Sequence, residues 1–253
     1  MMLDVISAAL RNEGFSIEAF DIIDSTNTYL KNNADCKNEG HIVIAGEQSA
    51  GRGRLGRRFF SPEGTGVYMS ILLKPELAGE TLTYITAAAA VSLSEAIDTI
   101  SGKTTDIKWV NDIYIGGKKV CGILTEAVFD GDKMKHAVLG IGINVRAPIG
   151  GFPDEIKDIA ASVFDEADDK TVASLVAAFL KRFFTYYNKL DKRQYLGTYK
   201  EKMLYLGENI TVLSPTETYE ATLVSVNDDF SLNVVRGNEH KRIFTGEISI
   251  RKK

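Results

Sequence analysis

The spacing of apolar residues along the chain predicts where helices form. Three stretches repeat apolar residues every three or four positions, which places those residues on one face of a helix. These stretches are residues 3–10, 82–97 and 171–190, and a last short helix is predicted near residues 195–204. Asp24-Ser25 predicts a further helix start, because short side-chain oxygens can bond the free amides of a first turn.

Runs of β-branched and aromatic residues predict strands between these helices. The runs are residues 17–23, 41–45, 66–73, 106–115, 118–129 and 136–145. Gly116-Gly117 and Asp130-Gly131 separate the last three runs and are typical of hairpin turns. The alanine-rich helix at 82–97 suits close packing on such strands. The pattern therefore predicts an α+β fold with a mixed, mainly antiparallel sheet and packed helices.

The pattern changes near residue 206. From there four short strands are predicted, separated by turn residues, at 209–213, 219–226, 231–235 and 240–244. Short strands at close spacing are typical of a small β-barrel. We therefore predict two domains, residues 1–205 and residues 206–253.

Composition and charge exclude several classes of function. Lys and Arg number 30 against 34 Asp and Glu among 253 residues, and a net charge of -4 argues against general adhesion to nucleic acid or anionic membranes. No apolar run reaches the length of a membrane span, and residues 1–14 lack the features of an export signal, so we expect a cytoplasmic protein. Two cysteines and three histidines are too scattered for a disulfide framework or a zinc site.

One loop concentrates positive charge in this acidic chain. Residues 51–58, "GRGRLGRR", contain the spacing G-x-G-x-x-G. A dinucleotide site needs a helix that starts within the glycines, whereas a strand follows here. Arginine side chains and glycine amides can bind phosphate or carboxylate together. A solvated basic loop is the alternative, and the loop alone does not decide between them.

Other polar positions are ambiguous when each is taken alone. "DSTN" at 24–27 is explained by helix capping, and "KWVNDIY" at 108–114 by an exposed strand end or a turn. Lys119 would ordinarily be solvated. Gly140 and Gly142 lie within a strand pattern, where glycine weakens the strand unless something must approach the backbone.

In chain order, these segments resemble a known set of motifs. "DSTN", "EQSAGRGRLGR", "FSPEGTGVYMS", "KWVNDI", "KKVCGIL" and "GIGINV" are similar to motifs of the biotin protein ligase family, and "GEIS" at Gly246–Ser249 is similar to the end of its C-terminal barrel. The resemblance implies a class II synthetase-like biotin/lipoate ligase catalytic domain followed by a small SH3-like β-barrel. It also implies a two-step reaction: biotin and ATP form biotinyl-AMP and pyrophosphate, and a lysine of a biotin carboxyl carrier protein domain of a biotin-dependent carboxylase then displaces AMP.

The resemblance also implies which residues form the site. The biotin site would comprise Ser25, Thr26, Asn27, Gln48, Arg52, Gly53, Arg54, Lys119 and Gly122. The ATP site would comprise Arg54, Arg57, Lys108, Asn111, Asp112 and Asn144, with Asp112 as the ligand of Mg2+, the implied cofactor. Lys119, Arg54 and Arg52 would be catalytic, because cations are required where two anionic substrates meet. The family often closes an aromatic residue over adenine after "GIN", and Phe152 is the nearest candidate here.

Two other functions are compatible with parts of this pattern. A lipoate-protein ligase would bind an apolar dithiolane, so the polar residues at 25–27 and Gln48 favour biotin. A non-catalytic, ligand-sensing module that binds the carrier is disfavoured by Lys119 and the intact arginine loop. The 23 residues before "DSTN" predict one helix and one strand with a net negative charge, so we expect a monofunctional form without a DNA-binding domain and no nucleic-acid or membrane partner. A homodimer stays open.

Overall fold

The computed structural model describes residues 2–75, 81–131, 133–214, 216–244 and 249–252. Its helices are α1 (Met2–Asn12), α2 (Thr26–Asn33), α3 (Thr81–Ser101), α4 (Asp169–Tyr187) and α5 (Leu196–Glu201). Its strands are β1 (Ile17–Ile23), β2 (Ile42–Gln48), β3 (Gly66–Leu73), β4 (Asp106–Lys108), β5 (Asp112–Ile115), β6 (Lys118–Asp130), β7 (Lys133–Asn144), β8 (Asn209–Leu213), β9 (Thr218–Val226), β10 (Leu232–Arg236), β11 (Glu239–Ile243) and β12 (Ser249–Lys252).

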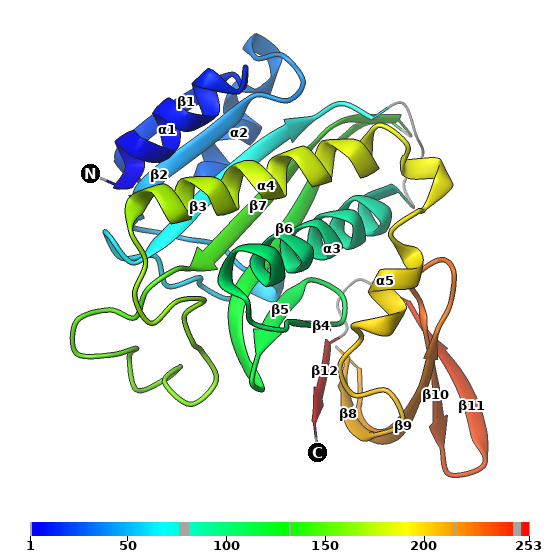
Figure 1. The fold of residues 1–253 in the computed structure, drawn as a ribbon. Helices are drawn as coiled ribbons and strands as arrows, with labels where there is room; N and C mark the ends of the chain where they lie inside the picture. Colours follow the sequence, from blue (N-terminus) through cyan, green and yellow to red (C-terminus); the bar gives the residue numbers. More distant parts are fainter. Residues whose placement is uncertain (1, 76–80, 132, 215, 245–248, 253) are drawn as a thin grey trace.

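The larger sheet has seven strands in the order β1-β2-β3-β7-β6-β5-β4 (Figure 1). Only β1 and β2 pair in parallel within this described sheet, and the other neighbours are antiparallel. Gly116 and Gly117 adopt φ angles of 57° and 79° between β5 and β6, a conformation that glycine adopts without strain. The expectation of a mixed, mainly antiparallel sheet is confirmed.

Helices cover both faces of this sheet. α1, α3 and α4 pack on one face, and Figure 1 shows α3 and α4 in front of the strands. On the opposite face, Leu30 and Ala34 from α2 and its C-terminal turn pack against Val43, Leu72 and Val138 of three neighbouring strands. Because side chains alternate along a strand, residues in step with these three point toward α2. The candidate site lies on this face.

The smaller sheet has the order β11-β10-β9-β8-β12 and is antiparallel in its described strands. It contacts the larger unit through Phe230, which is fully buried. The Phe230 ring centroid lies 5.8 Å from that of Tyr195 and 5.0 Å from that of Tyr199. Of the expected "GEIS" ending, Gly246 to Ile248 lie outside the described residues, and Ser249 begins β12. The boundary at residue 206 stays a prediction.

The single strand expected over 106–115 is wrong, because the structure divides it into β4 and β5, which pair with each other. The Asn111 amide bonds the Lys108 carbonyl at 3.2 Å and closes a turn between the two strands. On the edge of β4 away from β5, the Ile107 amide donates to the Lys202 carbonyl at 2.7 Å, and the Leu204 amide donates to the Ile107 carbonyl at 2.9 Å. The segment at 202–204 thereby bridges to β4 and does not continue the helix, so α5 ends earlier than the helix expected to residue 204.

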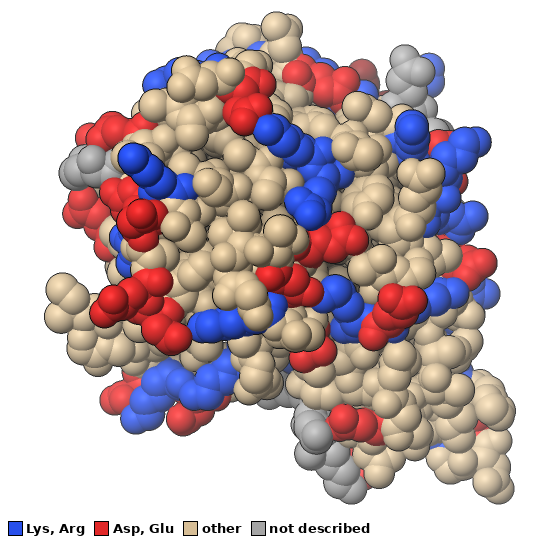
Figure 2. Space-filling view, viewed as in Figure 1, with Lys and Arg blue, Asp and Glu red and all other residues tan. Residues whose placement is uncertain are grey.

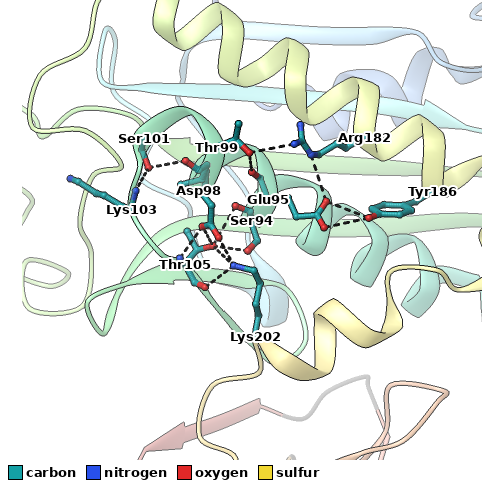
Figure 3. Close-up of polar contacts among 11 residues, drawn as sticks. Ser94, Glu95, Asp98, Thr99, Ser101, Lys103, Thr105, Arg182, Tyr186 and Lys202 are labelled. Atoms are coloured by element: carbon teal, nitrogen blue, oxygen red, sulfur yellow. Dashed lines mark hydrogen bonds and ion pairs between the residues drawn. The ribbon is translucent and has the colours of Figure 1, made fainter.

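A polar cluster joins α3, β4 and the end of α5 (Figure 3). The carboxylate of Asp98 accepts hydrogen bonds from the amide and hydroxyl of Thr105, at 2.9 and 2.6 Å, and from Lys202. Ser94 bonds the Thr105 hydroxyl, and both residues are buried. The cluster fixes the start of β4, and with it the position of Lys108 at the strand's end.

On the face of the molecule shown in Figure 2, acidic and basic side chains are interspersed. In the described part of the chain, no helix has the length and apolar character needed to cross a membrane.

Candidate active site

One row of residues crosses five neighbouring strands on the α2 face. Tyr68, Gly142, Gly122, Asp112 and Lys108 lie opposite one another in β3, β7, β6, β5 and β4. Residues directly opposite in paired strands share a face. The two glycines leave a flat area between Tyr68 and Asp112, which we call the glycine shelf.

The ring of Phe59 lies on the glycine shelf. A Cβ atom built on Gly142 would lie 2.4 Å from this ring, and one built on Gly122 would lie 3.2 Å from it. Phe59 also contacts Tyr68 edge to face, with ring centroids 6.4 Å apart. The glycines in these strands therefore permit a close approach to the backbone, which is the reason that the sequence pattern suggested for "GIGIN".

A bulge turns Lys119 toward the same shelf. Lys119 and Gly122 are three residues apart and would face opposite sides of a regular strand. However, the pairing of β5 with β6 shifts between Ile113 and Tyr114. Tyr114 therefore pairs with Lys119, which brings Lys119 to the face of Gly122. A Cβ atom on Gly122 would lie 3.1 Å from Lys119 Nζ. Lys119 Nζ lies 2.7 Å from Asp112 Oδ1, and both side chains are mostly buried.

Asp112 keeps bonding capacity in this arrangement. Its Oδ1 atom forms an ion pair with Lys119 Nζ, and a carboxylate has further lone pairs that can bind another group. Lys108, directly opposite Asp112, reaches the Tyr114 hydroxyl at 3.3 Å. Among the described residues, no group of three His, Cys, Asp or Glu side chains is placed to hold a metal ion by itself.

The start of α2 carries a buried polar network. Gln48 Oε1 accepts hydrogen bonds from the amide of Thr26 at 2.9 Å and from its hydroxyl at 3.1 Å. Gln48 Nε2 in turn donates to the Ser61 hydroxyl at 3.1 Å, and the Ser70 and Thr26 hydroxyls are 2.7 Å apart. Ser25 is the N-cap of α2, with its hydroxyl 3.4 Å from the Thr28 amide nitrogen.

Asn27 lies in the same network, above Gly140. Its Oδ1 atom accepts from the Ser70 hydroxyl at 2.6 Å, and its Nδ2 atom donates to Glu126 at 3.0 Å and to the Leu124 carbonyl at 3.4 Å. A Cβ atom on Gly140 would lie 2.1 Å from Asn27 Oδ1. Any side chain at position 140 would therefore displace Asn27.

The arginine loop forms a small hairpin beside the shelf. Arg52 and Arg58 form an antiparallel bridge, and the Gly53 amide donates to the Arg57 carbonyl at 2.8 Å. Leu55 turns the chain with a φ angle of 57°. Because the bridge and the turn shape the hairpin through the backbone, its arginine side chains remain available for other contacts.

Two of the loop arginines reach the site. Arg52 Nη2 lies 3.2 Å from Glu126 Oε1, and Arg54 Nη1 donates to Asn111 Oδ1 at 3.1 Å. Burial lowers the pKa of Arg54, and the charge of Asp112 opposes that shift. Arg57 is exposed on the hairpin, and within the described ranges no hydrogen bond or ion pair joins it to the shelf residues.

Two further candidates lie toward the loop that follows β7. Asn144, the last residue of β7, donates from Nδ2 to the Ala161 carbonyl at 3.1 Å. Phe152 lines a pocket of about 550 Å³ together with Lys103, Lys118 and Lys157. Apart from Phe152, the lining of that pocket includes none of the residues expected to bind biotin or ATP.

Sequence reasoning missed Phe59, Ser70 and Glu126. Ser70 interrupts an apolar strand, and a fully buried polar residue in such a position is a usable signal. Glu126 ends the quoted run "KKVCGILTE", four residues after Gly122, and so shares its face. Phe59 had no such signal, because only the fold places its ring on the shelf.

The fold has known counterparts. A model of the biotin/lipoate A/B protein ligase family matches residues 19–144. The chain is 34% identical over 245 residues to the bifunctional ligase/repressor BirA of Bacillus subtilis (strain 168), covering 91% of this chain and 72% of that protein. It is 27% identical over 227 residues to a biotin--[acetyl-CoA-carboxylase] ligase of Paracoccus denitrificans, covering 87% and 94%.

Among solved structures, the biotin protein ligase of Aquifex aeolicus in complex with biotin and ATP superposes with a TM-score of 0.80 at 32% identity, covering 94% of this chain and 99% of that one. These likenesses define the class of protein, which is a ligase, and they confirm the expected fold. The chain belongs to the biotin/lipoate A/B protein ligase family.

Proposed function

We propose that this protein is an ATP-dependent biotin protein ligase. It activates biotin as biotinyl-5'-AMP, releases pyrophosphate and transfers biotin to a lysine of a biotin carboxyl carrier protein domain. The observation that carries the proposal is the glycine shelf between two unlike sets of side chains. The polar network of α2 lies at one end of the shelf, and the contact of Lys119 with Asp112 lies at the other.

The polar network suits the ureido head of biotin. Thr26, Asn27 and Gln48 present hydroxyl and amide groups in a mostly buried place, and the Ser25 hydroxyl lies one residue before them. An apolar head such as the dithiolane of lipoate offers no hydrogen-bond donor or acceptor to these groups, whereas the ureido head can bond them. The site therefore favours biotin over lipoate.

The cations suit the junction of two anions. The carboxylate oxygen of biotin attacks the α-phosphorus of ATP, and the bond to pyrophosphate breaks. Lys119, Arg52 and Arg54 offset the repulsion between carboxylate and phosphate and stabilise the charge that develops. In the second step the uncharged amine of the carrier lysine attacks the acyl carbon, AMP leaves with the bonding pair, and the nitrogen loses its proton.

ATP would be held toward β4, β5 and the end of β7. Lys108, Asn111 and Asn144 supply a cation and two amides there, and Arg57 of the loop would approach the triphosphate. Magnesium that enters with ATP needs only one or two protein carboxylates, and the carboxylate of Asp112, which pairs with Lys119 in the ligand-free protein, would supply one. The ion would neutralise part of the phosphate charge.

Biotin-dependent exchange of labelled pyrophosphate into ATP tests the proposal. We expect exchange with biotin and not with lipoate, and a loss of about 10²- to 10³-fold in Lys119→Ala. Lys118→Ala is the matched control, because Lys118 bonds the Lys157 carbonyl at 3.2 Å, away from the shelf. Exchange that needs no biotin, or an active and folded Lys119→Ala protein, would contradict the proposal.

A further inference from the structure

Glu126 collects three nitrogen donors on the shelf side of β6. Its Oε2 atom accepts from Asn27 Nδ2 at 3.0 Å, and its Oε1 atom accepts from Lys31 Nζ at 3.1 Å and lies 3.2 Å from Arg52 Nη2. Asn27 and Lys31 are one turn apart on α2, whereas Arg52 comes from the arginine loop. One carboxylate therefore joins α2, β6 and the loop.

This carboxylate is charged although it is mostly buried. Its side chain is only 17% exposed, and burial acts to raise the pKa of Glu126. The hydrogen bonds from Asn27 and Lys31, with the charges of Lys31 and Arg52, outweigh that effect and place the pKa below its ordinary value. A fixed negative charge on this face of the sheet repels anionic substrates, so Glu126 does not bind them directly.

We propose that Glu126 is a positioning residue that holds Arg52 in the ligand-free protein and releases it to the anionic group of the substrate. The identity of the substrate that Arg52 then contacts rests on the proposed function. Arg52 is 45% exposed in its side chain and so is free to move, whereas Lys31 remains on Glu126 after Arg52 leaves. In the ligand-free protein the Glu126 carboxylate thus binds Arg52 in place of the substrate and keeps the loop near the shelf. A substrate anion then replaces Glu126 as the partner of Arg52.

The two partners of Glu126 have opposite effects on this equilibrium. Without the charge of Glu126, Arg52 loses its anion, and the ligand-free loop opens more often. Without Lys31, Glu126 has only Arg52 as a cationic partner and holds it more strongly. A general loss of stability would instead move both variants in the same direction.

Limited digestion with an arginine-specific protease measures loop opening at Arg52 to Arg58. In ligand-free protein we expect cleavage about threefold faster in Glu126→Gln and about threefold slower in Lys31→Ala, the size appropriate to a partly exposed ion pair. With saturating biotin and ATP, all three proteins should be equally protected, because the ligand then holds Arg52. Glu18→Gln is the matched control, because Glu18 also accepts from a tyrosine and a lysine, at 2.7 and 2.8 Å, but lies away from the loop.

Steady-state kinetics supply a second readout. Lys31→Ala should raise the KM for biotin about threefold with little change in kcat, and Lys31→Arg should restore it. The proposal is wrong if Glu126→Gln leaves ligand-free cleavage unchanged, or if the two variants shift it in the same direction. These ligand-free comparisons remain valid even if the protein fails to exchange pyrophosphate, so they test the loop separately from the proposed function.

Discussion

Trp109→Phe tests whether the C-terminal sheet positions the nucleotide half of the site. The indole Nε1 of Trp109 donates to the Phe230 carbonyl at 2.8 Å, and both residues are buried. Trp109 follows Lys108 directly and precedes Asn111 and Asp112 by two and three residues. The contact therefore joins the turn before β10 to the segment that we expect to bind ATP.

The magnitude follows from what the substitution removes. A buried carbonyl left without its donor costs about 1–3 kcal/mol. The smaller ring also leaves a void, which adds on the order of 1 kcal/mol. A domain has about 5–15 kcal/mol of stability, so the protein should still fold. The Tyr199 hydroxyl still donates to the Val110 carbonyl at 3.2 Å, so the segment should shift rather than detach.

The assay is steady-state ligation with ATP and biotin varied separately, together with urea unfolding. We expect the KM for ATP to rise about tenfold, an effect of about 1.4 kcal/mol, and the KM for biotin to change by less than about twofold. Val176→Ala is the control, because Val176 is fully buried in α4 and its truncation also costs on the order of 1–3 kcal/mol. Equal changes in both KM values, or the same split in the control, would refute the reasoning.

Three further outcomes are expected. Gly142→Ala should lower biotin-dependent exchange more than about tenfold, because the new methyl would meet the Phe59 ring, whereas Gly197→Ala, with open space around it, should not. Burial lowers the pKa of His41 and His136 below the ordinary value of 6.5, so the unfolded chain binds protons at a higher pH than the folded protein does. The free energy of unfolding, measured by urea titration, should therefore fall as the pH drops below 6.5. His136→Gln should make this fall with pH less steep. By fluorescence anisotropy at low salt, this chain should not bind inverted-repeat DNA selectively, because its net charge of -4 disfavours contact with phosphates; biotin-enhanced binding would contradict this.

Long periodic patterns predicted most of the fold. The strand expected at 17–23 is β1 with the same bounds, and the helices expected at 82–97 and 171–190 are α3 and α4 within a few residues. These elements bury a continuous apolar face, so the local pattern and the tertiary packing agree. The prediction of one strand over 106–115 was wrong because the local pattern and the tertiary packing disagree there. The β-branched residues of this stretch favour one strand. However, Ile107 pairs with the segment at Met203, almost a hundred residues away. The chain turns after Lys108, so that β4 pairs with this segment on one side and with β5 on the other.

The candidate site depends on register, which no local pattern contains. Gly122, Asp112 and Lys108 meet because three antiparallel strands place them opposite one another. A slip of one residue in β6 would turn Glu126 and Gly122 to the other face and remove the shelf. The bulge in β6 opposite Tyr114 also determines the directions of two adjacent lysine side chains. It directs Lys119 toward Asp112 and Lys118 away from it. Glu126 was missed for this reason: its chemistry is ordinary, and only the pairing of β6 with β7, together with α2 above that face, makes it the partner of Arg52.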